Sequence, residues 1–149
     1  KEQILTHNQG GKFAYSSTDL FEFEFYTLKN RYSGRAPQYV GITVQELLKR
    51  GDQHIQEGKK ALEGVKAYNK WKLDTVIDDI FEDFFKPVKG RKMTFFEARV
   101  IEQYFISYYG GGKAHKGMGV LFNRTNAMSK TAFDYWKKHG NFNPCKFFV

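Results

Sequence analysis

The sequence predicts an α+β protein in which a small antiparallel sheet of about three strands is flanked by helices. One observation is an aromatic segment, residues 21–26, that alternates with a period of two, as half-buried strands do. The other is a Thr-x-x-Glu pattern at Thr43 and again at Thr94, each time close to an apolar helical stretch. Strands with interleaved helices favour this class, and 149 residues suffice for one domain with a buried core.

Three strands are predicted. In the first, the phenylalanines of FEFEFY alternate with glutamates and end on Tyr26. The segment RYSGRAPQ supplies a turn, and QYVGIT, residues 38–43, is the second strand of a hairpin with a long loop. A third strand is predicted around Lys72–Ile77. The acidic residues in and after it lack the spacing of a calcium loop and indicate an exposed acidic face: Asp74, Asp78, Asp79, Glu82 and Asp83.

The first helix is predicted to follow the second strand directly. Thr43 and Glu46 have the spacing of a capping box, in which the two side chains satisfy free N–H groups at the helix start. The helix then runs through Arg50 and His54 and ends within residues 58–64, where glycines recur.

Two further helices are predicted in the second half of the chain. Thr94 and Glu97 form another capping box before the aromatic-rich segment FFEARVIEQYFISYYGG, and Gly110 ends that helix. Residues 129–139 form a short helix with a basic last turn, which complements the negative end of the helix dipole.

The composition favours a polyanionic partner. The formal net charge is +8, the sequence pI is about 9.5, and the last 40 residues are strongly basic. Nucleic acid, an anionic membrane face and an acidic protein all fit this charge, and so does a merely solubilising surface. The sequence has no unbroken apolar run of about 18 residues, so we expect no membrane span. Cys145 is the single cysteine, so no internal disulfide forms, and no Cys/His cluster has zinc spacing.

The chain is predicted to form one domain with three parts. Residues 1–20 are predicted to be a loosely structured N-terminal extension, residues 21–126 a compact core, and residues 127–149 a basic C-terminal helix and tail. The start of the chain does not resemble a signal peptide.

One constellation in the core points to chemistry. Arg50 and His54 lie four residues apart on a predicted helix, which leaves them roughly 40° apart on one face. Tyr39 lies on the strand that precedes this helix, and Gly41 allows the close approach of another group because it has no Cβ. Tyr39, Arg50 and His54 are therefore expected to point into one cleft. The fork of an arginine there suits a phosphate.

The alternative for each residue is structural. The tyrosines would then be core aromatics, and Arg50 and His54 an ordinary solvated helix face. Glu102 would be a surface partner of Arg99 in an i,i+3 pair.

Taken together, these segments resemble the GIY-YIG nuclease family. YVGIT followed by Arg50 and His54 is similar to the family's second motif and the next helix, and Tyr26 matches the tyrosine of its first motif. The segment ARVIEQYFI resembles the helix with the metal-binding glutamate, which is Glu102 here. LFNRTN resembles the closing element with a functional asparagine, which is Asn123, with Asn126 as the second choice. The resemblance covers about residues 21–126, but Glu24 and Phe25 replace the first motif's glycine and isoleucine.

The resemblance implies an endonuclease that hydrolyses phosphodiester bonds, with DNA as the first choice of substrate and RNA as the second. Glu102 would hold one Mg²⁺, for which Mn²⁺ could substitute, and Arg50 would bind the phosphate. Tyr26 or Tyr39 would activate the attacking water, and His54 would assist by hydrogen bonding. Which tyrosine is the base stays open.

The basic residues Lys113, Lys116 and Arg124 are predicted to neutralise phosphates near the cleft. A toxin domain that acts in the cytoplasm after delivery in a larger secreted protein fits the sequence, with an acidic immunity or inhibitor protein as partner. A mobile-element or restriction-type endonuclease fits equally well. From another class, a non-catalytic basic module that binds nucleic acid or an acidic protein remains an alternative.

Overall fold

The computed structural model describes residues 18–33, 36–80, 92–111, 120–123 and 127–139. These residues form an α+β fold with one antiparallel sheet in the order β3-β2-β4 and a two-stranded pair of β1 and β5, as the class predicted from sequence requires. The strands are β1 (Phe21–Glu22), β2 (Glu24–Asn30), β3 (Pro37–Thr43), β4 (Thr75–Asp79) and β5 (Lys92–Met93). The helices are α1 (Leu47–Leu62), the 3₁₀ helix η3 (Ala67–Asp74), α3 (Phe95–Tyr108) and α4 (Lys130–His139).

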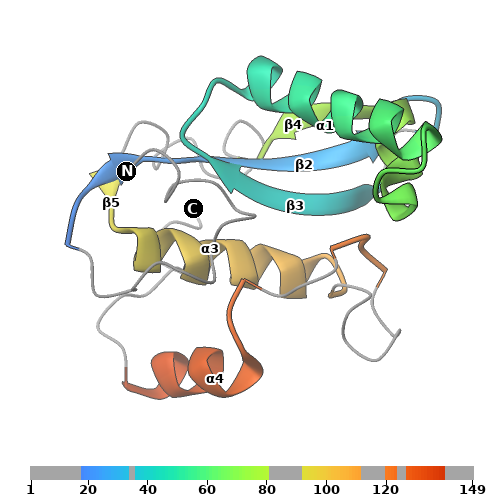
Figure 1. The fold of residues 1–149 in the computed structure, drawn as a ribbon. Coiled ribbons are helices and arrows are strands. Elements are labelled where there is room, and N and C mark those ends of the chain that lie inside the picture. Colours follow the sequence, from blue (N-terminus) through green and yellow to red (C-terminus); the bar gives the residue numbers. More distant parts are fainter. Residues whose placement is uncertain (1–17, 34–35, 81–91, 112–119, 124–126, 140–149) are drawn as a thin grey trace.

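The three-stranded sheet lies between two helical layers. Helix α1 covers one face of the sheet and α3 runs beneath the other, with α4 on the far side of α3 (Figure 1). On the α3 side, Phe25, Val40 and Ile42 pack in one buried cluster with residues of α3 such as Ala98 and Phe105. This cluster is the main hydrophobic core.

The opposite face of the sheet is built from the alternate residues of the same strands. Tyr26 and Leu28 of β2 and Tyr39 of β3 form a buried cluster there, against which Trp71 of η3 and Ile77 of β4 pack. The period-two alternation therefore separates an apolar face toward α3 from an aromatic face toward α1 and η3. This second face carries most of the predicted site.

The predicted capping box at the start of α1 is wrong. Thr43 is the last residue of β3, pairs with Glu24 of β2 and is fully buried. Its hydroxyl accepts a hydrogen bond from the Gln45 backbone N–H at 3.0 Å, and α1 begins only at Leu47. Sheet pairing holds Thr43 in the strand, so its side chain serves the turn instead of the helix.

The capping box predicted before α3 is confirmed. The Glu97 backbone N–H donates to Thr94 Oγ1 at 3.1 Å, and the Thr94 N–H donates to Glu97 Oε1 at 2.9 Å. The helices predicted within residues 43–64 and 129–139 are also present, as α1 and α4.

Two strand boundaries differ from the prediction. The period-two segment is divided at Phe23, because β1 pairs with β5 while β2 pairs with β3 and β4. The third strand begins at Thr75, since Lys72 belongs to η3 and its carbonyl accepts a hydrogen bond from Thr75 Oγ1 at 2.8 Å. In the predicted acidic face, Asp78 forms an ion pair with Lys29 at 3.1 Å.

Several predicted features lie outside the described residues. They are positions 1–17 of the N-terminal extension, Glu82, Asp83, Lys113, Lys116, Arg124, Asn126 and the tail from residue 140, which includes Cys145. Among the helices of the described ranges, none has the length and apolar character needed to cross a membrane.

Candidate active site

The two tyrosines come from adjacent strands of the sheet. The register places Tyr26 of β2 opposite Gly41 of β3, and Leu28 opposite Tyr39. The rings of Tyr26 and Tyr39 therefore lie on one face, with centroids 6.3 Å apart. A Cβ at Gly41 would lie 2.4 Å from Tyr26 Cζ, so the glycine is what allows the Tyr26 ring to cross β3.

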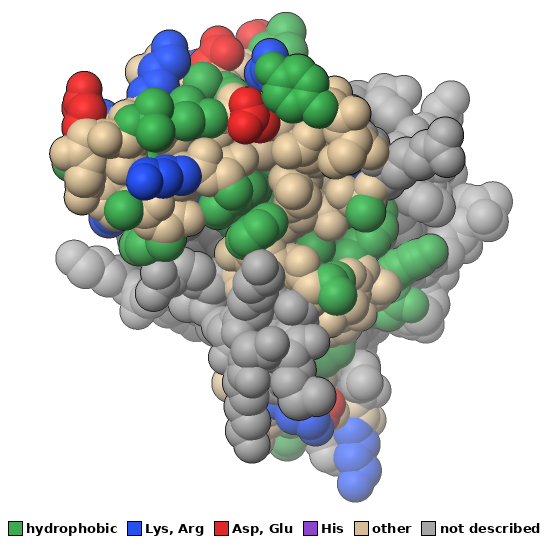
Figure 2. Space-filling model, turned by 90° about the vertical axis from the view of Figure 1, so that its right-hand side faces the viewer, with side chains coloured by type: hydrophobic (Ala, Val, Ile, Leu, Met, Phe, Trp, Pro, Cys, Tyr) green, Lys and Arg blue, Asp and Glu red, His purple; other side chains and the backbone are tan. Residues whose placement is uncertain are grey.

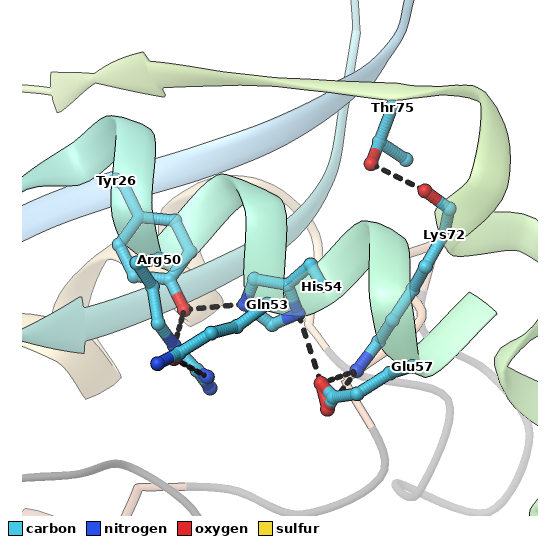
Figure 3. Close-up of polar contacts among 7 residues, drawn as sticks. All are labelled: Tyr26, Arg50, Gln53, His54, Glu57, Lys72 and Thr75. Atoms are coloured by element: carbon cyan, nitrogen blue, oxygen red, sulfur yellow. Dashed lines mark hydrogen bonds and ion pairs between the residues drawn. The ribbon is translucent and has the colours of Figure 1, made fainter. Parts of the chain in front are cut away.

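Helix α1 brings Arg50 and His54 onto these tyrosines. The Tyr26 hydroxyl lies 2.8 Å from His54 Nε2 and accepts a hydrogen bond from Arg50 Nε at 3.3 Å (Figure 3). The His54 ring also contacts the Tyr39 ring, with centroids 5.4 Å apart. Arg50 is 6 % exposed and His54 is fully buried, so the alternative of a solvated helix face is wrong for both.

The guanidinium of Arg50 is only partly used. Its Nη1 donates to Gln53 Oε1 at 2.9 Å, and its Nε is held by Tyr26. Its Nη2 is buried and has no hydrogen-bond partner in the part of the chain that the structure describes. A buried cationic donor without a partner is costly, and an anion beside Tyr26 would satisfy it.

Burial sets the protonation states of Tyr26 and His54. It raises the pKa of Tyr26 to about 12, although the nearby charge of Arg50 opposes the shift. It also lowers the pKa of His54 to about 4, with the positive charges of Arg50 and Lys72 adding to the effect. Near pH 7 the resting site therefore contains a neutral phenol next to a neutral imidazole.

Two charged residues that the sequence did not single out complete the network. Glu57, one turn after His54 on α1, places Oε1 3.4 Å from His54 Nδ1. Lys72 of η3 donates to both oxygens of Glu57, at 3.0 and 3.4 Å (Figure 3). The i,i+3 spacing of His54 and Glu57 could have identified the first pair. No sequence pattern identifies Lys72, because only the packing of η3 on α1 brings it to Glu57.

Glu102 lies on α3 and is fully buried. Its Oε1 accepts a hydrogen bond from Arg99 Nη1 at 3.1 Å, so the predicted i,i+3 contact exists but lies in the interior instead of on the surface. Burial is the main cause of the raised pKa of both Tyr26 and Tyr39, and the charge of Glu102 adds to it.

Asn123 is occupied by the backbone of β3. Its Oδ1 accepts a hydrogen bond from the Val40 N–H at 3.0 Å, and its Nδ2 donates to the Val40 carbonyl at 2.8 Å. Both ends of the amide therefore hold the strand residue next to Tyr39. The structure places Asn123 beside the tyrosine cluster as a support for β3.

A row of aromatic rings leads away from the cluster. The Tyr39 and Trp71 centroids are 5.8 Å apart, and Trp71 stacks on Phe122 at 4.7 Å. Phe122 in turn lines an open pocket of about 800 Å³ together with Tyr108 and Tyr109. Figure 2 faces this end of the molecule and shows hydrophobic side chains across the middle of the surface, with charged side chains above and below them. Exposed aromatic faces of this kind can stack on nucleobases.

The donor set for a metal ion is small. Within the described ranges, no group of three or more His, Cys, Asp or Glu side chains gathers to hold an ion. Glu102, which the sequence predicts to hold an Mg²⁺ ion, is a single carboxylate and is fully buried. Such an ion would have to share Glu102 with Arg99.

Comparison of the chain with models of known protein families, with curated proteins and with solved structures gives no match.

Proposed function

We propose that this chain is a nuclease with a core of the GIY-YIG type that hydrolyses phosphodiester bonds. DNA is the first choice of substrate and RNA the second. The observation that carries the proposal is the buried Nη2 of Arg50, which lacks a partner among the described residues and stands beside the Tyr26–His54 pair. A phosphate would supply acceptor oxygens to this nitrogen, and its charge would balance the guanidinium. As charge grows on the phosphate oxygens during reaction, the same contact would strengthen.

Tyr26 is the better candidate for the residue that activates water. Its hydroxyl contacts both Arg50 and His54, which are a cation and a proton acceptor. The ring of Tyr39 packs against the rings of Tyr26 and His54 and would hold both in place. The proton of the attacking water would pass to the Tyr26 oxygen as the phenol proton moves to His54 Nε2.

Glu102 would hold the divalent ion, Mg²⁺ or Mn²⁺, and the ion when bound would stabilise negative charge on the leaving oxygen. The basic residues Lys113, Lys116 and Arg124 would bind the nucleic-acid backbone by charge, so that affinity would fall steeply with salt. If the chain is a toxin domain, an acidic inhibitor protein would compete for the same groups.

One observation favours a second function. Tyr26, His54 and Glu102 are all fully buried, whereas a catalytic hydroxyl must meet water and substrate. In this alternative the polar cluster holds α1 on the sheet, and the chain is a non-catalytic basic module that binds nucleic acid or an acidic protein. The two functions differ in whether a phosphate reaches Arg50, which is 6 % exposed.

A cleavage assay separates them. The wild type is incubated with supercoiled plasmid DNA and, in parallel, with total RNA, in Mg²⁺ and in EDTA. Arg50→Lys keeps the charge but loses the planar fork, and we expect it to cut roughly 100-fold more slowly. Glu102→Gln should lose the Mg²⁺-dependent cutting, because the amide is a poorer ligand for the ion. The matched control is Arg31→Lys, because Arg31 is exposed and its guanidinium donates to the Thr75 carbonyl, at 3.3 Å, away from the tyrosines.

Cutting that requires Mg²⁺, survives in Arg31→Lys and falls in Arg50→Lys would support the nuclease. Folded wild-type protein that binds nucleic acid and cuts neither substrate would instead establish the binding module.

A further inference from the structure

The pair of Tyr26 and His54 begins a line of contacts that adds two charged groups not used by the proposed mechanism, Glu57 and Lys72. From Tyr26 the line runs through His54 and Glu57 to Lys72, with successive contacts of 2.8, 3.4 and 3.0 Å (Figure 3). We propose that Glu57 is a positioning residue that orients His54 to accept the Tyr26 proton, and that Lys72 holds Glu57 for this task. The inference rests on the proposed nuclease function.

The first argument concerns the two nitrogens of the His54 ring. Near pH 7 a neutral imidazole has one N–H and one lone pair. Nδ1 lies 3.4 Å from Oε1 of Glu57, a carboxylate that can only accept, and it makes no hydrogen bond within the described residues. The N–H therefore belongs on Nδ1, and the lone pair of Nε2 is left facing the Tyr26 hydroxyl. Without Glu57, nothing in the described network would select this tautomer.

The second argument concerns Lys72. Lys72 is only 6 % exposed, and its ammonium lies 5.7 Å from the centroid of the Tyr39 ring and 5.8 Å from that of Trp71. A buried ammonium of this kind requires an anion, and Glu57 provides both of its oxygens. Burial opposes ionisation of Glu57, but the close contact with His54 and the charge of Lys72 outweigh it and lower the pKa of Glu57 to about 2.

The close packing of η3 on α1 is what brings Lys72 into range. A Cβ at Gly58 would lie 2.8 Å from the backbone nitrogen of Leu73, so only glycine allows the two elements to approach this far. Gly58 directly follows Glu57 on α1, and Leu73 directly follows Lys72 on η3. This close approach of the two backbones thus lies beside the ion pair.

The proton balance of the step is simple. The water oxygen forms a bond to phosphorus, and the bond from phosphorus to the leaving oxygen breaks, with the electron pair going to that oxygen. The proton of the water moves to the Tyr26 oxygen, and the Tyr26 proton moves to His54 Nε2. His54 is then a cation whose Nδ1–H donates to Glu57, and this contact should shorten from 3.4 Å because charged hydrogen bonds are shorter.

The direct test is the tautomer of His54, which needs no nuclease activity. In protein with ¹⁵N-labelled histidine, the nitrogen and ring-proton shifts at pH 7 distinguish Nδ1–H from Nε2–H. We expect Nδ1–H in the wild type. Glu57→Gln can donate as well as accept, so we expect it to populate the Nε2–H form. The matched control is Glu63→Gln, at the exposed end of the same helix, which should leave the spectrum unchanged.

Cleavage kinetics supply the second readout. Because Glu57 acts through His54, we expect Glu57→Gln to lower kcat roughly 10- to 100-fold with little change in KM. Glu57→Gln leaves Lys72 buried without its partner and could unfold the protein. Glu57→Gln combined with Lys72→Met removes both charges, keeps the volume, and gives the same prediction.

A folded variant of either kind that retains the Nδ1–H tautomer, or one that cuts at the wild-type rate, would overturn the proposal. If the wild type cuts neither DNA nor RNA, the nuclease function fails and the proton-transfer role fails with it. The tautomer measurement would still decide whether Glu57 orients His54.

Discussion

Replacing Gly41 with alanine tests the geometry of the cluster most directly. The new Cβ would lie 2.4 Å from both Cζ and Oη of Tyr26 and 2.9 Å from Cε1. Carbon atoms pack at about 3.5 Å or more, so the ring would have to withdraw by about 1 Å. The Tyr26 ring is fully buried, and its hydroxyl has a partner at 2.8 Å, His54 Nε2, so the movement would disturb that contact.

We therefore expect Gly41→Ala to lower the free energy of unfolding by about 1–3 kcal/mol, the usual cost of overpacking. Displacement of a reacting group by about 1 Å can slow a reaction roughly 100-fold, and we expect a loss of that order in the cleavage rate. Urea unfolding followed by tryptophan fluorescence measures the first quantity, and plasmid cleavage by the folded protein measures the second.

The matched control is Gly51→Ala, on α1 where this helix packs against β4. Its Cβ would meet the Ile77 side chain, with Cγ2 at 2.9 Å, and would not touch Tyr26. A side chain can move aside, and alanine is about 0.5–1 kcal/mol better than glycine inside a helix, so stability should change little. Wild-type stability and cleavage in Gly41→Ala would refute the close approach of Tyr26 to β3. A loss of stability without any loss of cleavage would refute the role of the Tyr26 hydroxyl in the reaction.

Two further predictions concern pH and helix capping. Burial lowers the pKa of His54 to about 4 from 6.5, so the unfolded chain binds a proton between these values and the folded protein does not. Stability should be full above pH 6.5 and fall by about 3 kcal/mol as the pH drops to 4. Urea midpoints across this range should fall less steeply for His54→Gln, and equal slopes would contradict the buried neutral imidazole. Thr94→Ala removes one half of the confirmed capping box of α3, and we expect it to lower the free energy of unfolding by about 1 kcal/mol in the same assay. Thr43 does not cap α1, so Thr43→Ala should leave the helix content in the circular dichroism spectrum unchanged.

Local patterns predicted the elements better than their ends. The same Thr-x-x-Glu spacing gives a true capping box at Thr94 and none at Thr43. Thr43 differs because β3 pairs it with Glu24, and such pairing over a long sequence distance is not visible in a four-residue pattern. Likewise, Lys72 looked like part of a strand and belongs to η3, since its carbonyl is engaged by Thr75.

The candidate site was predicted in part for the same reason. Arg50 and His54 share a helix face through local geometry alone, and Tyr39 follows from the alternation of one strand. The sequence could not reveal that these groups are buried, or that Lys72 approaches them from η3. Both facts depend on how α1, η3 and the sheet pack together. Glu57 was within reach of the sequence, three residues after His54, but without Lys72 it had no distinguishing feature.

The pairing of Asn123 with Val40 has a consequence for the behaviour of the protein in solution. Strand β3 is at the outer edge of its sheet, and a bare edge strand offers its free backbone groups as a template on which another chain can add. Here the side-chain amide of Asn123 takes both backbone groups of Val40, and the Phe122 N–H takes the carbonyl of Gln38. The segment thus imitates one more strand for a few residues. On either side of Tyr39, the backbone groups of Val40 and the carbonyl of Gln38 are thereby already bonded by the chain's own residues.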